Sequence, residues 1–170
     1  ETDFRPAYRQ IIGLKNKLSK TPTIALTATA TKWVKEDICK TLELAQPIQI
    51  TNSFDRPNIE LKVLKTTNKL EAIPEALAPK GTPAIVYAGT RKSVELLSTH
   101  LNNMGHRTNF FHGGALAKEQ RIADWLVVIL RVMVATSAFG MGFDKSHVQG
   151  VVHATLPFSV EQYYQEIGRC

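Results

Sequence analysis

The stretch "TPAIVYAGTRKSVELLSTHLNNMGHRTNFF", residues 82–111, reads as a strand, a helix and a second strand in succession. Its "AIVY" run is short and wholly apolar, which is typical of a strand buried on both faces. A helix is expected over 91–104, and Gly105 follows as a stop signal. Its apolar face carries, at helical spacing, Val94, Leu97, Leu101 and Met104. The strand–helix–strand order predicts a unit of parallel sheet.

The same alternation continues to the end of the chain. The further elements expected are helices over 68–78 and 116–126, strands over 131–136 and 150–154, and a final helix that begins after Ser159. Gln162, three residues after Ser159, completes the signature of a capping box. The segment "DWLVVILRVMVAT" is apolar almost throughout, so either a helix and a strand abut there or the strand is longer than expected. These patterns predict an α/β fold, a parallel sheet with helices on both faces.

The N-terminal part shows a less regular pattern. Apolar spacing predicts a helix over 4–18 and another that begins near Thr31. "TIALT" and "PIQI" are expected to be strands, and so is the alternation of Ile59, Leu61 and Val63. Asn, Asp and Pro gather in residues 52–58, which favours a connection between two domains at this point.

Composition narrows the class of protein. The chain has 170 residues, 44% of them hydrophobic and 21% charged, which is ordinary globular material. No apolar run approaches the roughly 20 residues of a membrane-spanning helix, so no membrane association is expected. The net charge of +6 is a mild bias toward polyanions. Two distant cysteines and five histidines without ligand partners at useful spacing predict neither a disulfide framework nor a metal site.

Notable residues follow three of the expected strands. Thr90 and Arg91 follow "AIVY", His112 and Gly113 follow "NFF", and Thr136 follows "VMVA". The carboxyl ends of parallel strands meet at one edge of a sheet, and function collects there. Backbone N–H groups, hydroxyls and cations at that edge suit phosphate groups. We therefore expect a ridge that follows a nucleic-acid backbone, although each signal alone also fits an ordinary turn or helix cap.

Six segments in this order are much more specific than any one of them: "ALTATAT" (25–31), "SFDRPNI" (53–59), "IVYAGTRKSVELL" (85–97), "FHGGALAKEQR" (111–121), "VMVATSAFGMGFDK" (132–145) and "YYQEIGR" (163–169). The series resembles the RecQ family of DNA helicases in helicase superfamily two. "SFDRPNI" and "AFGMG" in particular favour that family over RNA-directed relatives.

The resemblance implies two RecA-like domains with ATP and Mg²⁺ bound between them. Residues 1–52 would be the end of the first domain, 53–58 the connection, and 59–170 most of the second. The P-loop, which holds most of the ATP and Mg²⁺ ligands of the family, would precede residue 1, because both ends of the chain look cut from something longer. Zinc is expected only downstream of residue 170.

The resemblance also implies a role for individual residues. Gln165 and Arg169 would be catalytic and face the γ-phosphate, with a second arginine of that motif expected after residue 170. The remaining assignments are cofactor binding by Gly140, Gly142 and Asp144, DNA binding by Thr90, Arg91, His112, Gly113 and Thr136, and coupling of the two sites by Thr27, Ala28 and Thr29. For the last three residues, a simple cap of the helix near Thr31 remains open.

The function implied is an ATP-dependent helicase that moves 3′ to 5′ along single-stranded DNA and unwinds duplex DNA in repair and recombination. The chain alone is expected to be inactive. Two alternatives remain: a catalytically dead helicase-like module that binds nucleic acid, and an RNA-directed helicase of superfamily two. The expected location is cytoplasmic, with the nucleoid in a bacterium, or nuclear in a eukaryote.

Overall fold

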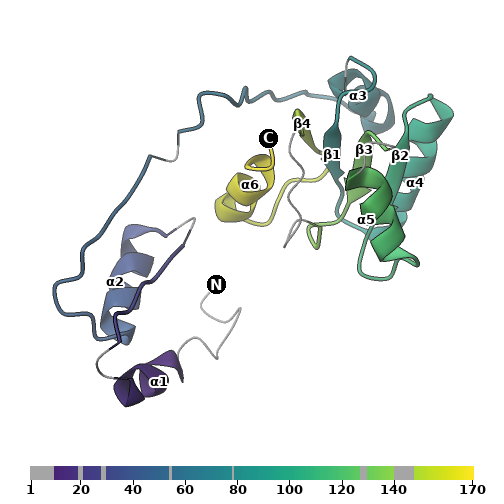
Figure 1. Ribbon diagram of the computed structural model, residues 1–170. Coiled ribbons are helices and arrows are strands. Elements are labelled where there is room, and N and C mark those ends of the chain that lie inside the picture. Colours follow the sequence, from purple (N-terminus) through teal and green to yellow (C-terminus); the bar gives the residue numbers. More distant parts are fainter. Residues whose placement is uncertain are drawn as a thin grey trace. The chain divides into compact units, whose positions relative to one another are not determined.

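The computed structural model describes residues 10–18, 21–27, 30–53, 55–77, 79–126, 130–139 and 148–170. The chain divides into two compact units, residues 1–55 and 56–170. The first two labelled helices belong to the first unit, and the other labelled helices and all the labelled strands belong to the second (Figure 1). No helix among the described residues has the length and apolar character needed to cross a membrane.

The first unit contains two helices, α1 (Ile11–Lys17) and α2 (Lys32–Thr41). The described part of the helix expected over 4–18 is thus helical from Ile11, and its first residues lie outside the described ranges. The second helix begins as expected, because the Thr31 side chain accepts a hydrogen bond from the backbone N–H of Val34 at 3.3 Å.

The prediction of strands at 23–27, 47–50 and 59–63 is wrong, because these residues form no strand in the structure. Most of their apolar side chains are exposed, among them Leu26 at 90% and Ile48 at 91%. A strand is stabilised by hydrogen bonds to a neighbouring strand and by a buried face. In the part of the chain that the structure describes, these segments have neither.

The second unit is built around one parallel sheet. Its strands are β1 (Ala84–Tyr87), β2 (Thr108–Phe111), β3 (Val132–Ala135) and β4 (Gly150–His153). Its helices are α3 (Lys69–Ala76), α4 (Arg91–Asn103), α5 (Lys118–Leu126) and α6 (Val160–Ile167). The strand order is β2-β3-β1-β4, and every neighbouring pair is parallel. The predicted α/β fold class is confirmed.

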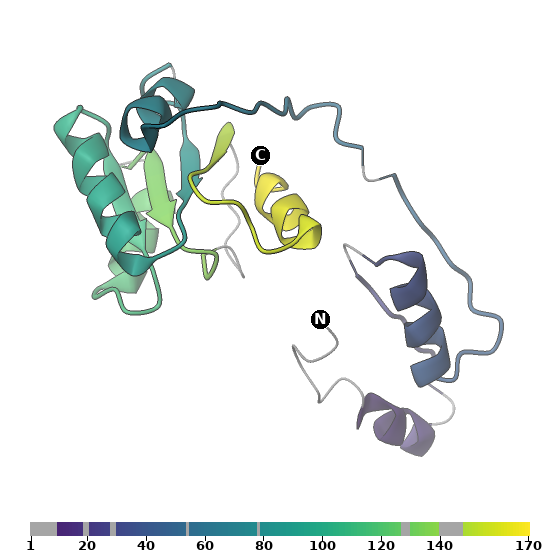
Figure 2. The same ribbon diagram turned by 180° about the vertical axis from the view of Figure 1, so that it is seen from behind.

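Alternate residues of the central strands feed two separate cores. Ala84 and Val86 face a cluster that includes Leu77 after α3 and buried residues of α4. Ile85 and Tyr87 face the opposite cluster, which contains Trp125 of α5. Helices therefore cover both faces of the sheet, with α3 and α4 on one side and α5 on the other (Figures 1 and 2).

The final helix begins as the sequence predicts. The Ser159 side chain accepts a hydrogen bond from the backbone N–H of Gln162 at 3.1 Å. The Gln162 side chain accepts from the N–H of Phe158 rather than from that of Ser159, so only half of the expected capping box forms. The cap directs α6 back over the end of β4.

Candidate nucleic-acid interface

The loops that follow β1, β2 and β3 lie together at the carboxyl edge of the sheet. The N–H of Ala88, just after β1, donates to the carbonyl of Ala135 at the end of β3 at 2.9 Å. The N–H of Thr136 donates to the carbonyl of Phe111 at the end of β2 at 3.2 Å. Thr90, Gly113 and Thr136 therefore sit on neighbouring loops of one edge, as the predicted phosphate-following ridge requires.

Arg91 connects the first two of these loops. A Cβ placed on Gly114 would lie 2.9 Å from Nη1 of Arg91, whereas one on Gly113 would meet nothing closer than 3.9 Å. The guanidinium therefore lies directly over Gly114, where any side chain would displace it. This contact places an exposed cation beside the exposed turn of backbone at Gly113.

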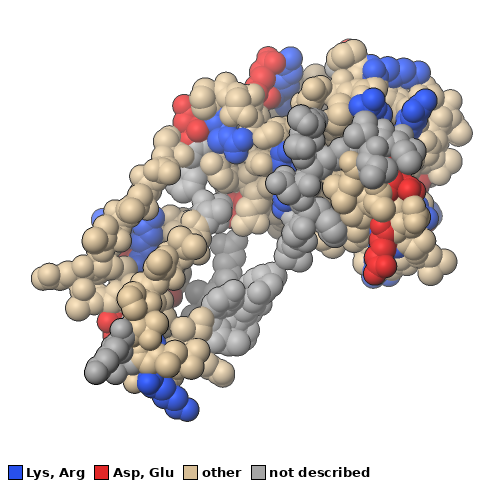
Figure 3. Space-filling model, viewed as in Figure 1, with Lys and Arg blue, Asp and Glu red and all other residues tan. Residues whose placement is uncertain are grey.

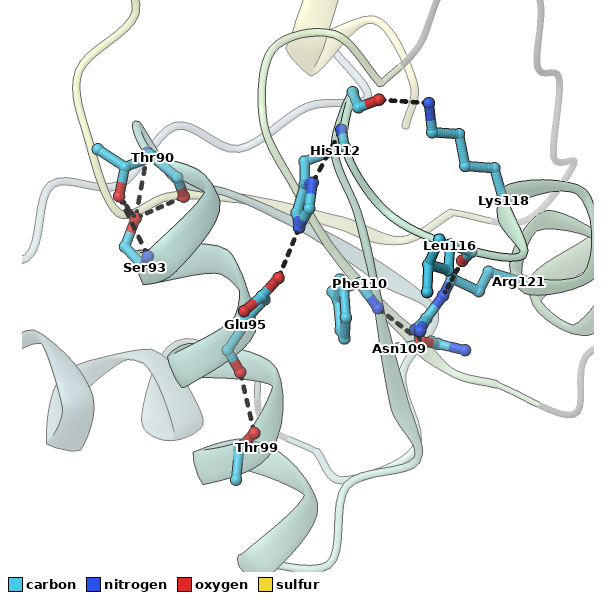
Figure 4. Close-up of polar contacts among 12 residues, drawn as sticks. Thr90, Ser93, Glu95, Thr99, Asn109, Phe110, His112, Leu116, Lys118 and Arg121 are labelled. Carbon is cyan, nitrogen blue, oxygen red and sulfur yellow. Dashed lines mark hydrogen bonds and ion pairs between the residues drawn. The ribbon is translucent and has the colours of Figure 1, made fainter.

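The buried side chain of His112 supports the turn at Gly113 and Gly114 from the protein interior. Its side chain is only 4% exposed, and Nδ1 accepts the backbone N–H of Gly114 at 3.2 Å (Figure 4). Because Nδ1 is an acceptor, the ring proton of the neutral imidazole lies on Nε2, which is 2.9 Å from Oε1 of Glu95 on α4. The buried ring thus holds the turn at Gly113, and the exposed atoms there belong to the backbone.

Two cations of α5 hold the other side of the same turn (Figure 4). Lys118 donates through Nζ to the carbonyl of Gly113. Arg121 donates through Nε to the carbonyl of Leu116 at 2.9 Å, and its guanidinium carbon lies 4.0 Å from the centroid of the Phe110 ring. The segment between β2 and α5 is therefore held along its length by side chains of two helices.

Thr90 is the N-cap of α4. Its hydroxyl accepts the N–H of Ser93 at 3.1 Å, and the Ser93 hydroxyl accepts the N–H of Thr90 at 3.1 Å, which is a complete capping box (Figure 4). The side chain is exposed and lies at the positive end of a 13-residue helix. The cap and a phosphate contact are compatible roles for this residue.

Replacing Thr90 with alanine should lower the free energy of unfolding by about 1 kcal/mol, because the first turn of α4 loses its side-chain acceptor. Urea unfolding of Thr90→Ala and Thr90→Ser measures this, and the serine variant should retain most of the stability. Thr99→Ala is the matched control, since the Thr99 hydroxyl donates to the carbonyl of Glu95 within the same helix and caps no helix end. Equal losses for Thr90→Ala and Thr99→Ala would contradict the prediction.

The loop after β3 turns sharply and is anchored in the core. The N–H of Phe139 donates to the carbonyl of Thr136 at 2.9 Å, and the Phe139 ring packs against Phe111 and Trp125 at centroid distances of 5.1 and 5.4 Å. The hydroxyl of Tyr87 donates to the carbonyl of Phe139 at 3.2 Å. Thr136 is held at the sheet edge because the turn that it begins is anchored by the buried side chain of Phe139.

Helix α6 carries the two residues predicted to be catalytic. Gln165 is exposed, and Arg169 follows the helix end, half-buried, with its N–H 3.3 Å from the carbonyl of Glu166. The two residues are close in sequence, Gln165 in the last turn of α6 and Arg169 just beyond its C-cap, Gly168. A glutamine amide and a guanidinium there fit the phosphates of a nucleotide in their donor chemistry.

Most of the other residues predicted from the sequence lie outside the part of the chain that the structure describes. Gly140, Gly142, Asp144, Ala28 and Thr29 lie outside the described residues, and Thr27 is exposed in the first unit. Among the residues that the structure describes, no group of three or more His, Cys, Asp or Glu side chains could hold a metal ion. Lys and Arg side chains are scattered over the face shown in Figure 3. The evidence for a phosphate site is therefore the arrangement of the loops after β1, β2 and β3, and not a large basic patch among the described residues of this face.

Residues 68–170, which include every element of the second unit, match the model of the helicase conserved C-terminal domain. The chain belongs to this family. Two relatives extend the similarity to 98% of the chain: the ATP-dependent DNA helicases RecQ of Bacillus subtilis, 44% identical, and of Pasteurella multocida, 41% identical. The expected resemblance to RecQ helicases is confirmed. The chain spans 29% and 27% of the length of these two relatives.

The solved structures show the same fold. Dbp5 of Saccharomyces cerevisiae, in its L327V form bound to Gle1 and IP6, matches with a TM-score of 0.74 at 22% identity, over 98% of this chain and 45% of its own. At this identity the likeness concerns architecture alone. The sheet described above is thus the RecA-like sheet of helicase C-terminal domains.

Several residues of this helicase domain were missed by sequence reasoning. Glu95, Lys118 and Arg121 hold the segment 112–116 through contacts with its first, second and last residues, and the sequence predicted a role for none of the three. Glu95 is separated from His112 by 17 residues, and no spacing rule connects a helix side chain to a turn at that distance. The "HGG" sequence was the one signal available, and it pointed to the turn rather than to its supports.

Proposed function

We propose that the chain is part of a RecQ-type, ATP-dependent helicase that moves 3′ to 5′ along single-stranded DNA and unwinds duplexes in repair and recombination. Its second unit would bind the sugar–phosphate backbone of one strand. The observation that carries the proposal is the gathering of Thr90, Gly113 and Thr136 on neighbouring loops, with the Arg91 guanidinium lying over Gly114 in the second of them. The names of the relatives support DNA as the nucleic acid. Such a protein would work in the compartment that holds the DNA.

Phosphate contacts at these loops would come from several groups. Arg91 would supply charge, the exposed turn at Gly113 would supply backbone N–H groups, and Thr90 and Thr136 would supply hydroxyls. These groups read no base, so the strand could pass along the ridge whatever its sequence. That property suits a protein that must move along DNA.

Bound ATP would supply the free energy of each cycle through its hydrolysis. Within this chain, Gln165 and Arg169 would face its phosphates, with Gly140, Gly142 and Asp144 completing the contact, and Thr27, Ala28 and Thr29 would relay the change between ATP and DNA. The chain contains no G-x-x-x-x-G-K-[ST] segment to cradle β- and γ-phosphates with Mg²⁺. We therefore expect the 170 residues alone to hydrolyse no ATP.

The decisive experiment is an ATPase assay on a full-length polypeptide that carries this chain. Hydrolysis should be stimulated by single-stranded DNA, and a strand with a 3′ overhang should be unwound. Stimulation by RNA but not by DNA would replace the proposal with an RNA-directed helicase. Binding of DNA with no ATPase at all would favour a catalytically inactive binding module.

Replacing Arg91 with alanine should weaken binding of single-stranded DNA in a salt-dependent way. Loss of one phosphate contact lowers the slope of log K against log salt concentration by about 0.7 for a single strand. Fluorescence anisotropy with labelled oligothymidylate at several salt concentrations measures the slope on the full-length protein. Arg107→Ala is the matched control. Arg107 is exposed and precedes β2, so it lies at the amino-terminal ends of the strands, away from the loops that follow their carboxyl ends. Equal slopes for wild type and Arg91→Ala would show that Arg91 does not contact the phosphates of the DNA.

A further inference from the structure

The last residue of β4, His153, lies beside Tyr87 in the register of the sheet. The two rings are stacked, with centroids 5.5 Å apart and planes at 17°. His153 therefore faces the same side of the sheet as Tyr87, where Trp125 and Phe139 also pack. Each of the two residues is the last of its strand, just before the loops at the carboxyl ends of the sheet.

Glu166 of α6 contacts the His153 ring at its nitrogen Nε2, whereas Tyr87 stacks on the ring face. Its Oε2 lies 2.7 Å from Nε2 of His153, and its Oε1 accepts a hydrogen bond from Nε2 of Gln162 at 2.8 Å. The side chains of His153 and Glu166 are only 11% and 8% exposed. A carboxylate buried to this extent is costly unless both oxygens are hydrogen-bonded, as they are here. The pair therefore fixes α6 on the end of β4.

Tyr87 continues the contacts to the loop after β3. Its hydroxyl donates to the carbonyl of Phe139, which closes the turn that begins at Thr136. Burial, and next the negative charge of Glu166, raise the pKa of Tyr87 to about 12, while Arg169 acts in the opposite direction. The hydroxyl consequently keeps its proton, and its role as donor, throughout the neutral range.

We infer that Glu166, His153 and Tyr87 are positioning residues that hold helix α6, with Gln165 and Arg169, in a fixed relation to the turn that carries Thr136. The contacts run without a gap from the helix to the turn: carboxylate to imidazole, imidazole to phenol ring, phenol hydroxyl to the Phe139 carbonyl. The inference rests on the proposed function, since it assigns the two ends to ATP and to DNA. It adds the route by which a shift of α6 would reach the DNA-binding turn.

The test measures coupling rather than activity alone. In the full-length protein, the Kd for labelled oligothymidylate is measured with and without adenylyl imidodiphosphate, a non-hydrolysable ATP analogue, and the ratio of the two Kd values is the coupling. Tyr87→Phe removes one hydroxyl and keeps the ring; Glu166→Gln removes the charge and keeps the shape. Each should bring the ratio at least about 5-fold closer to one, within the usual range of coupling factors.

The double variant and a control make the result specific. If the three residues act as one route, Tyr87→Phe combined with Glu166→Gln should lose no more coupling than the larger single loss. Glu161→Gln, the same change at the first turn of α6, should leave the ratio unchanged. Circular dichroism confirms folding, and if Glu166→Gln fails to fold, His153→Gln takes its place in the cycle.

The outcomes separate the inference from the proposed function. A wild-type protein without DNA-stimulated ATPase or without any effect of the analogue on DNA affinity would overturn the proposed function, and with it the inference. A wild-type protein that shows both, with Tyr87→Phe retaining the full ratio, would overturn the inference alone. Additive losses in the double variant would likewise show that the residues do not form one route.

Discussion

Arg169→Ala in a full-length polypeptide that carries this chain is expected to lower kcat for DNA-stimulated ATP hydrolysis by about 10²–10³-fold. Loss of a single preorganised donor to developing negative charge typically has an effect of this size. The affinity for single-stranded DNA in the absence of nucleotide should change little, because Arg169 follows α6 and does not belong to the loops after β1, β2 and β3. A steady-state ATPase assay and an anisotropy titration measure the two quantities.

Two comparisons sharpen this prediction. Arg169→Lys retains the charge but loses the planar fork that can bind two phosphate oxygens, so its kcat should lie between those of wild type and the alanine variant. Arg107→Ala removes an exposed arginine elsewhere in the same unit and should retain wild-type kcat. An unchanged kcat in Arg169→Ala would show that this arginine does not face the nucleotide.

Trp125→Ala is expected to destabilise the second unit by about 3–5 kcal/mol, the usual cost of removing a large buried aromatic side chain. Trp125 is only 2% exposed and packs edge-on against Phe139, with ring centroids 5.4 Å apart at 75°. Its loss would leave a cavity between α5 and the loop after β3. Urea unfolding followed by circular dichroism measures the change in the free energy of unfolding.

Phe158→Ala provides the matched control, because Phe158 is an aromatic residue of the same unit that is 98% exposed. Its replacement should change the stability by no more than about 0.5 kcal/mol. The prediction would be wrong if the two variants unfolded at the same urea concentration. A changed m-value in Trp125→Ala would indicate an altered unfolded or native state rather than a simple cavity.

Helix α4 illustrates how far local sequence can lead. The expected range 91–104 and the observed Arg91–Asn103 agree, since the cap at Thr90 and the positive φ of 82° at Gly105 are both local features. The predicted apolar face was less accurate at its end. Met104 is exposed, whereas Ser98 is buried because its hydroxyl meets that of Thr108 at 3.1 Å.

The strands expected in residues 1–63 show the opposite case. The apolar residues at 23–27 and 47–50 do have a pattern typical of strands. A strand forms, however, only where another strand pairs with it through hydrogen bonds. No local rule reports whether that partner is present. The prediction of the four strands β1 to β4 is confirmed, because each of them lies next to another strand of the same sheet.

The amino-acid sequence by itself predicted the α/β class, the helices of the second unit and the three loops at one end of the sheet. It could do so because helix caps, glycine stops and apolar periodicity act within a few residues. Only the tertiary structure decided that the His112 ring lies buried beneath its turn and that Glu166 reaches His153. Both depend on contacts between elements far apart in the chain. Such contacts form when apolar faces pack, and no spacing along the sequence encodes them.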